Sequence, residues 1–255
     1  PCSRATGKLL FPSAEIRTWI AQAQTGGPMS QTGPRPAIVL GSHDPLLDWA
    51  IRQSRCGLAS FFDGSLDGLA RFARGEGLAA GLHVYDAATD SWNVPAVSER
   101  AADQNAVLIR FATRQRGLVY RAGDGAPGCL ADLPGLRFVP RQPESGTDRL
   151  FRDIAARDRL DLSRLTLSDL ARTEDEAVEA VRRGAADATF GLEAVASGYG
   201  LEFLPVIREQ FALLVDRKAW FDPQMQRLLA FCRSDAFAAK AQAYGGYDIT
   251  EFGTV

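Results

Sequence analysis

Three short turns carry serine or threonine hydroxyls next to glycine, and each turn follows an apolar run and precedes a helical pattern. They span residues 41–45, 64–68 and 144–147, with the sequences GSHDP, GSLDG and ESGT. The first turn of a helix leaves backbone N–H groups without partners, and the helix dipole favours negative charge there. Such helix starts bind oxyanions. A single serine at this position is usually only a helix cap, so the prediction depends on three turns that share one ligand.

These turns and one nearby cation define a candidate anion-binding site. Arg141 lies just before the third turn, and a guanidinium group can donate to two oxygens of an oxyanion at once, although a solvated surface arginine is the alternative. The candidate anion contacts are Ser42, His43, Ser65, Arg141, Ser145, Gly146 and Thr147. Secondary candidates are Asp44, His83, Arg114, Thr173 and Glu193. Arg116 lies beside Arg114, near the expected crossing between two halves of the fold.

The two histidines, His43 and His83, both follow predicted strands at the same rim. As cations they would favour an anion, and as neutral donors they would discriminate between protonation states. With Asp44 and Glu193 they also offer nitrogen and oxygen ligands to a metal. Their spacing matches no metal motif, so we expect no metal.

Motifs of known enzyme classes are absent from the sequence. It contains no GxSxG, HExxH, GxxxxGK[ST] or strand-linked GxGxxG, which mark hydrolases, zinc proteases, P-loop proteins and dinucleotide-binding folds. No two carboxylates form a recognisable acid–base pair. We therefore expect a binding protein without a cofactor rather than an enzyme.

The composition is that of a folded globular protein. Of 255 residues, 46% are hydrophobic and 24% charged, and the net charge of −2 does not favour a chain that coats nucleic acid by electrostatics alone. We find no apolar run near the length of a membrane span and no signal peptide. Cys2, Cys56, Cys129 and Cys232 show no CxxC spacing, so we expect reduced, structural cysteines and a cytoplasmic protein.

Apolar runs and helical patterns alternate from residue 37 onward, which predicts parallel sheets with helices on both faces. The expected strands are 37–41, 58–62, 78–84, 107–111, 117–121, 137–140, 187–191, 203–206 and 211–215. The expected helices are 45–55, 66–74, 146–157, 175–183, 223–232 and 236–244. Residues 65–84 and 173–194 repeat one plan of cap, helix, Arg-Gly turn and strand, which favours two lobes. Ligands of open α/β sheets bind at the carboxyl ends of strands.

The N-terminal part has a different pattern. Residues 7–20 predict a strand or hairpin at KLLF and then a helix capped by Ser13, whereas residues 21–36 are rich in Gly, Pro, Gln, Ser and Thr, as linkers are. Twenty residues cannot form a stable core alone.

Five segments carry a family resemblance: GSHDPLLDWAI, FFDGSLDGLARFARGEGLAAGLHVYD, ATRQRGLVY, LRFVPRQPESGTDRL and AVRRGAADATFGLEAVA. In order and content they resemble the periplasmic-binding-protein-like domain related to molybdate- and tungstate-binding proteins, from about residue 37 to 216. The resemblance implies a type II, two-lobed α/β fold with a hinge. Residues 37–115 and 202–255 would form lobe I, and residues 116–201 lobe II. It also implies anion contacts at Ser42, Ser65, Arg141, Ser145, Gly146 and Thr147.

Residues 1–20 resemble the wing and last helix of an excisionase-type winged helix. Together the resemblances imply the sensor domain of a cytoplasmic, helix-turn-helix transcriptional regulator that binds molybdate or tungstate. Such a regulator would contact DNA through a mostly missing N-terminal domain, act as a homodimer and need no membrane.

One departure concerns the ligand. After Thr166, relatives usually carry a Tyr and a His, whereas this chain reads SDLARTEDEAV. A larger anionic metabolite or a molybdenum-cofactor fragment is therefore an alternative ligand. The alternative classes are an extracytoplasmic oxyanion transport receptor and a pterin- or porphyrin-related transferase.

Overall fold

The computed structural model describes residues 3–5, 8–10, 34–123, 125–143 and 145–255. The chain divides into two compact units, residues 1–33 and 34–255. In the first unit, β1 (Ser3–Ala5) and β2 (Lys8–Leu10) form an antiparallel pair, so a strand does lie within KLLF. The helix expected after Ser13 and most of the expected linker lie outside the described residues.

The second unit is built on one mixed sheet, with nine strands among the described residues. They are β3 (Ile38–Gly41), β4 (Ala59–Phe62), β5 (Ala79–Leu82), β8 (Ala106–Tyr120), β9 (Arg137–Val139), β10 (Thr166–Leu167), β11 (Ala188–Leu192), β12 (Glu202–Asp216) and β13 (Tyr247–Asp248). Their order is β10-β9-β11-β8-β12-β5-β3-β4, and β13 pairs with β8. A separate short hairpin joins β6 (Tyr85–Asp86) to β7 (Ser91–Trp92).

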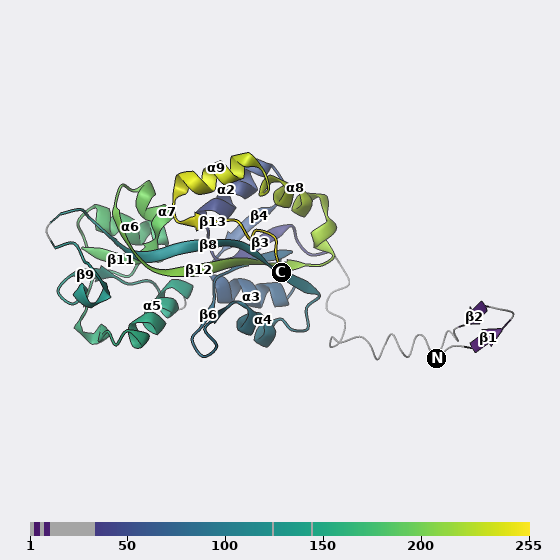
Figure 1. Cartoon of the computed structure of the whole chain (residues 1–255), viewed down its shortest axis with the longest axis horizontal. Helices are drawn as coiled ribbons and strands as arrows, with labels where there is room; N and C mark the ends of the chain where they lie inside the picture. The colour runs from purple at the N-terminus through teal and green to yellow at the C-terminus, as the bar shows by residue number, and fades with distance from the viewer. Residues whose placement is uncertain (1–2, 6–7, 11–33, 124, 144) are drawn as a thin grey trace. The chain divides into compact units, whose positions relative to one another are not determined.

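Helices cover both faces of this sheet, as the alternating pattern predicts (Figure 1). They are α2 (Pro45–Ser54), α3 (Ser65–Ala73), α4 (Val94–Arg100), α5 (Gly146–Arg157), α6 (Glu174–Arg182), α7 (Glu193–Gly198), α8 (Pro223–Phe231) and α9 (Asp235–Tyr244). In one half, α2, α8 and α9 lie on one face and α3 and α4 on the other. In the other half, α6 and α7 lie opposite α5.

Local caps explain where three of these helices begin. Asp44 Oδ1 accepts a hydrogen bond from Leu47 N at 2.7 Å, and Pro45 fits the first helical position of α2. Ser145 Oγ accepts from Asp148 N at 3.1 Å at the start of α5. Thr173 caps α6 in the same way, with Glu176 as its reciprocal partner. The positions of the site residues at these helix starts therefore follow from local sequence.

Two long antiparallel strands, β8 and β12, run through both halves of the sheet and join them (Figure 1). The sequence predicted two shorter strands in place of each, because charged residues such as Arg114 and Glu209 interrupt the apolar runs. This prediction was wrong, since the charged side chains are buried and paired with one another. The pairing also makes the centre of the sheet antiparallel, while β3 with β4 and β5, and β9 with β10 and β11, are parallel.

The hydrophobic core falls into clusters on either side of the sheet's centre. One cluster includes Val39, Phe111 and Phe211, and another includes Phe138 and Phe151. The rings of the last two stack at 4.8 Å. The second unit is therefore a two-lobed α/β fold, as expected.

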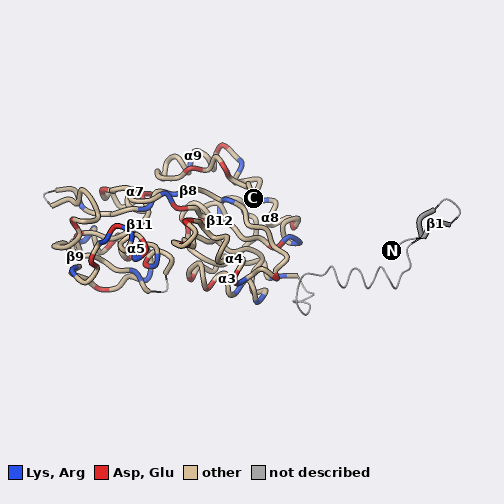
Figure 2. Tube along the Cα trace, turned by 60° about the horizontal axis from the view of Figure 1, so that its bottom comes forward, with Lys and Arg blue, Asp and Glu red and all other residues tan. Residues whose placement is uncertain are grey.

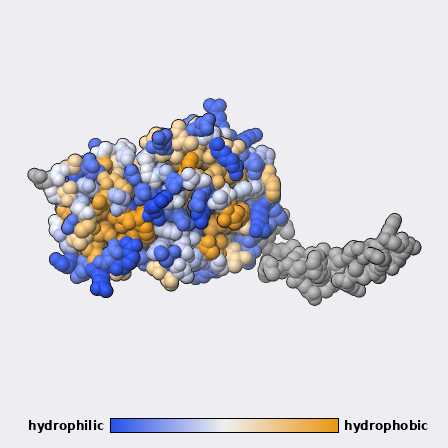
Figure 3. All heavy atoms as spheres, in the orientation of Figure 1, coloured by the Kyte–Doolittle hydropathy of each residue, from blue (hydrophilic) through white to orange (hydrophobic). Residues whose placement is uncertain are grey.

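Charged residues of both signs are spread along the chain trace of the second unit (Figure 2), and the face drawn in Figure 3 shows hydrophobic side chains in groups between hydrophilic ones. Among the described residues, no helix is both long and apolar enough to cross a membrane.

Candidate functional site

A hydrogen bond between two serines joins the turn that follows β3 to the start of α3. Ser42 directly follows β3, and its Oγ lies 2.8 Å from the Oγ of Ser65, the first residue of α3. Ser65 Oγ also accepts a hydrogen bond from His83 N at 3.0 Å. Ser42 and Ser65 are only 5% and 1% exposed, so both hydroxyls lie inside the protein.

The start of α5, from the other lobe, packs directly on His83. A Cβ atom on Gly146 would lie 2.9 Å from His83 Cε1 and 3.2 Å from Nε2. The backbone of α5 can come this close because Gly146 has no side chain. Two of the three predicted turns therefore contact the same histidine.

A cavity of about 240 Å³ lies between the starts of α3 and α5. Ser65 and His83 line one side, and Ser145 and Gly146 line the other. Beyond them the wall continues over apolar side chains, including Leu66, Val84 and Leu150. It also carries two arginines, Arg149 and Arg152, and two carboxylates, Asp148 and Asp153, and Arg152 Nε donates to Asp148 Oδ2 at 2.6 Å. The arrangement offers hydroxyls and helix N-termini to a ligand, which are neutral donors suited to an anion.

Behind the cavity, Glu209 of β12 is the centre of a buried ion-pair network. Its carboxylate pairs with Arg114 and Arg116 of β8, and the Arg116 Nε to Glu209 Oε2 distance is 2.7 Å. His83 Nδ1 lies 3.1 Å from the same oxygen. The two arginines are 1% exposed and Glu209 is not exposed at all. Residues 114 and 116 point to one face of β8 because side chains alternate along a strand.

The network extends into both lobes. On one side, Arg114 Nη1 donates to Asp44 Oδ2 at 2.8 Å, and Tyr247 Oη donates to the same oxygen at 2.6 Å. On the other side, Arg116 Nη1 donates to Thr147 Oγ1 at 3.0 Å and to Glu174 Oε1 at 2.6 Å. Ion pairs and hydrogen bonds therefore connect the start of α2 to the starts of α5 and α6.

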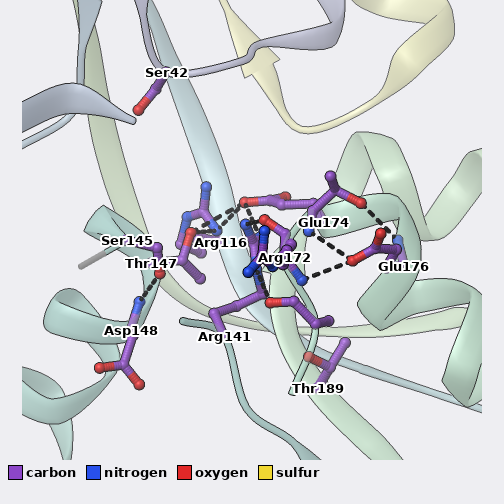
Figure 4. A network of polar contacts seen from close by, with 12 residues as sticks. Ser42, Arg116, Arg141, Ser145, Thr147, Asp148, Arg172, Glu174, Glu176 and Thr189 are labelled. Atoms are coloured by element: carbon purple, nitrogen blue, oxygen red, sulfur yellow. Dashed lines mark hydrogen bonds and ion pairs between the residues drawn. The ribbon is translucent and has the colours of Figure 1, made fainter. Parts of the chain in front are cut away.

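Arg141 is held by the lobe in which it lies. Its Nη2 donates to the Arg172 carbonyl at 2.8 Å and its Nε to the Ala171 carbonyl at 3.3 Å. Its Nη1 lies 3.8 Å from Glu174 Oε1 and is buried without a hydrogen-bond acceptor among the described residues (Figure 4). The positive charge of Arg141, which we expected to face the ligand, therefore lies next to the carboxylate of Glu174.

Burial and the arginines shift the pKa values of this network. Arg116 and Arg141 lower the pKa of Glu174 to about 2 despite its burial, and Arg114 and Arg116 hold the pKa of Glu209 well below its ordinary range. Burial lowers the pKa of His83, although Glu209 opposes the shift, so the imidazole is uncharged at neutral pH.

The low pKa of Glu174 predicts a loss of stability in acid. A carboxyl whose folded pKa is about 2, against an ordinary 4.5, stabilises the fold above pH 4.5 and loses this contribution as pH falls toward 2. Glutamine does not titrate, so we expect the unfolding free energy of Glu174→Gln to fall in acid by up to about 3 kcal/mol less than that of the wild type. Urea unfolding of both proteins from pH 6 to 2 measures it, and parallel curves would contradict the assignment.

The structure brings together most of the predicted anion contacts but not all of them. Ser65, Ser145 and Gly146 line the cavity, Ser42 bonds to Ser65, and Thr147 bonds to Arg116. His43 does not line it: its side chain is exposed and lies edge-on to Phe62, with ring centres 5.7 Å apart.

The secondary candidates have mixed positions. His83 lines the cavity, and Asp44 and Arg114 lie in the buried network. The Thr173 hydroxyl is used as a cap, since it accepts from Glu176 N at 3.0 Å. Glu193 packs against Gly246, near the C-terminal segment. Among the described residues, no group of three or more His, Cys, Asp or Glu side chains is arranged to hold a metal ion.

Sequence reasoning missed Glu174, Glu209 and Tyr247. Glu209 could have been found, because it is the charged residue just before the apolar run of 211–215. The sequence shows Glu174 only as an acidic residue in the first turn of a helix, where acidic residues are common because they interact favourably with the helix dipole.

Comparison with known proteins agrees with this architecture. A family model described as the PBP superfamily domain matches residues 49–233. The chain therefore belongs to this family of periplasmic-binding-protein-like domains, whose fold serves binding, receptor and sensor proteins.

Particular relatives are distant. The chain is 26% identical to the uncharacterized protein YvgK of Bacillus subtilis (strain 168) over 205 residues, which cover 76% of this chain and 64% of YvgK. It thus spans less than two thirds of that relative. A phosphate transporter substrate-binding protein with bound phosphate from Clostridium perfringens aligns with a TM-score of 0.60 at 9% identity, over 86% of this chain and 98% of that one. A phosphate transport receptor from Vibrio cholerae aligns at 0.54 and 14%, over 83% and 98%.

Proposed function

We propose that residues 34–255 bind a small oxyanion in the cavity between the starts of α3 and α5. The observation that carries the proposal is that hydroxyls at two helix starts, Ser65 and Ser145, line one cavity from opposite lobes. Helix N-termini stabilise a bound anion through directed N–H groups and through their dipoles. The names of the Clostridium perfringens and Vibrio cholerae proteins, which refer to phosphate, support an anion as the ligand class.

In this proposal, binding favours the closed arrangement of the lobes. A ligand that touches Ser65 and Ser145 together gains contacts in the closed form that an open form lacks, and this difference in affinity shifts the equilibrium between them. The contact of Gly146 with His83 defines the closed form. Molybdate and tungstate are our first candidates, because the sequence resembles domains related to proteins that bind them.

A larger anion is the second candidate, and the shape of the cavity supports it. A volume of about 240 Å³ far exceeds the roughly 10–15 Å³ that a cavity needs to hold one water molecule. The apolar wall of Leu66, Val84 and Leu150 would suit an organic part, and Arg149 a second acidic group.

We further propose that the domain senses its ligand for a cytoplasmic, dimeric transcriptional regulator. The support is the resemblance of residues 1–20 to part of a winged helix. DNA binding by the full-length protein that does not respond to its anion would contradict this role.

Removal of the Ser65 hydroxyl should weaken anion binding. We expect Ser65→Ala to raise the Kd for the bound oxyanion at least about tenfold, because a hydrogen bond to a charged group contributes roughly 1.5–3 kcal/mol. Calorimetric titration with molybdate, tungstate, sulfate and phosphate measures the effect. Ser54→Ala is the control, since that hydroxyl bonds to the Ile51 carbonyl at the far end of α2. If the wild-type protein binds none of the four anions, the larger ligand replaces the small oxyanion.

A further inference from the structure

Glu174 holds a position that an anionic ligand's oxygen would be expected to take. It is the first residue of α6, and its Oε1 accepts hydrogen bonds from Arg116 Nη1 at 2.6 Å and from Thr147 Oγ1 at 3.2 Å (Figure 4). The same oxygen lies 3.8 Å from Arg141 Nη1. Arg141 and Thr147 are two of the residues that the sequence assigns to the anion. Their counter-ion is therefore already part of the protein.

The buried charges at the junction of the lobes balance without any ligand. Three arginines and three carboxylates belong to the network, and their side chains are at most 15% exposed: Arg114, Arg116, Arg141, Asp44, Glu174 and Glu209. Their formal charges cancel. The cavity in front of them offers the neutral hydroxyls of Ser65 and Ser145, and its two arginines, Arg149 and Arg152, are matched by two carboxylates, Asp148 and Asp153. The protein therefore has no excess of positive charge here to compensate the negative charge of a ligand.

Glu174 is near enough to act on a ligand in the cavity. Thr147, to which it bonds, directly follows Gly146 of the cavity wall. The intervening groups are buried, so water screens the interaction weakly. The repulsion between a fixed carboxylate and a ligand grows in proportion to the charge of the ligand.

We infer that Glu174 sets the charge selectivity of the site, by reducing the advantage that a dianion such as molybdate or tungstate has over a monoanion of the same shape. This inference rests on the proposed binding of an oxyanion in the cavity. The helix starts bind either kind of anion, whereas the fixed carboxylate discriminates between them. Neutralising Glu174 would also free Arg141, whose Nη1 has no acceptor of its own among the described residues.

Tungstate and perrhenate test the inference, because they are tetrahedral oxyanions of similar size that carry two and one negative charges. For Glu174→Gln we expect perrhenate to bind about tenfold more tightly and tungstate about a hundredfold more tightly than to the wild type, as for a charge removed at about 12 Å and an effective dielectric constant of about 20. The ratio of the two Kd values would then shift about tenfold toward tungstate. Glu179→Gln is the matched control, because Glu179 lies on the same helix and pairs with Arg182 at the surface.

The possible results separate this inference from the proposed function. An unchanged ratio in Glu174→Gln, with both anions bound, would overturn the role of Glu174 and leave the oxyanion site intact. Binding of neither anion to either protein would overturn the proposed function and this inference with it. If Glu174→Gln does not fold, Glu174→Ala removes the same charge. The wild type adds an independent test, since a preference for tungstate over perrhenate of more than about tenfold would also contradict the inference.

Discussion

Gly146→Val should abolish high-affinity ligand binding while leaving most of the fold intact. The new Cβ would meet the His83 ring at 2.9 Å, closer than carbon atoms pack, and the two added methyl groups would fill more of the same space. Because Gly146 belongs to one lobe and His83 to the other, the clash is relieved when the lobes separate. We expect the Kd to rise at least about a hundredfold, since contacts that exist only in the closed form are lost. Calorimetric titration with the bound anion measures it.

Two further variants make this result specific. Gly198→Val adds the same side chain at the end of α7, where a Cβ meets nothing within 4 Å, and should bind as the wild type does. His83→Ala in the Gly146→Val background removes the clashing ring and should recover part of the affinity, as a double-mutant cycle measures. Gly146→Val with unchanged affinity would mean that the ligand binds without this closed contact.

Glu209→Gln should cause the largest loss of stability of any single change considered for this protein. The substitution keeps the size of the side chain but removes the charge that Arg114 and Arg116 share, and both guanidinium groups stay buried. Removal of one partner of a buried ion pair typically costs about 3–5 kcal/mol, because the remaining charge stays desolvated. We expect a decrease of this size in the unfolding free energy, measured by urea denaturation at pH 7.

The matched control is Glu251→Gln. Glu251 pairs with Arg110 at the surface, where both side chains are largely exposed, and exposed pairs contribute about 0–1 kcal/mol. Equal effects of the two substitutions would show that the network does not stabilise the fold. A small effect of Glu209→Gln alone would mean that water reaches the arginines when the carboxylate is neutralised.

The starts of the helices were predictable because their signals are local. Asp44 with Pro45, and Ser145 with Gly146, mark the first residues of α2 and α5 within a few positions of sequence. The cavity could be expected for the same reason, since these turns also carry its hydroxyls. The family resemblance added the expectation of a two-lobed fold.

The buried network could not be predicted in this way, since its partners are far apart in the chain. Arg114 and Glu209 are separated by 95 positions and meet because β8 pairs with β12 in one particular register. That register also converts an interrupted apolar pattern into one continuous strand. The contact between Gly146 and His83 has the same origin, because it depends on how the lobes close rather than on either local sequence.

The pairing of β8 with β12 has a consequence for how residues 34–255 come apart. Both chain crossings between the lobes are strands bonded to each other, and hydrogen bonds continue along them from Ala106 to Tyr120. If β8 and β12 separated, each strand would have a row of unpaired backbone N–H and C=O groups, and such exposed strand edges promote aggregation. Neither half is thus an autonomous folding module, and both should melt in one cooperative transition.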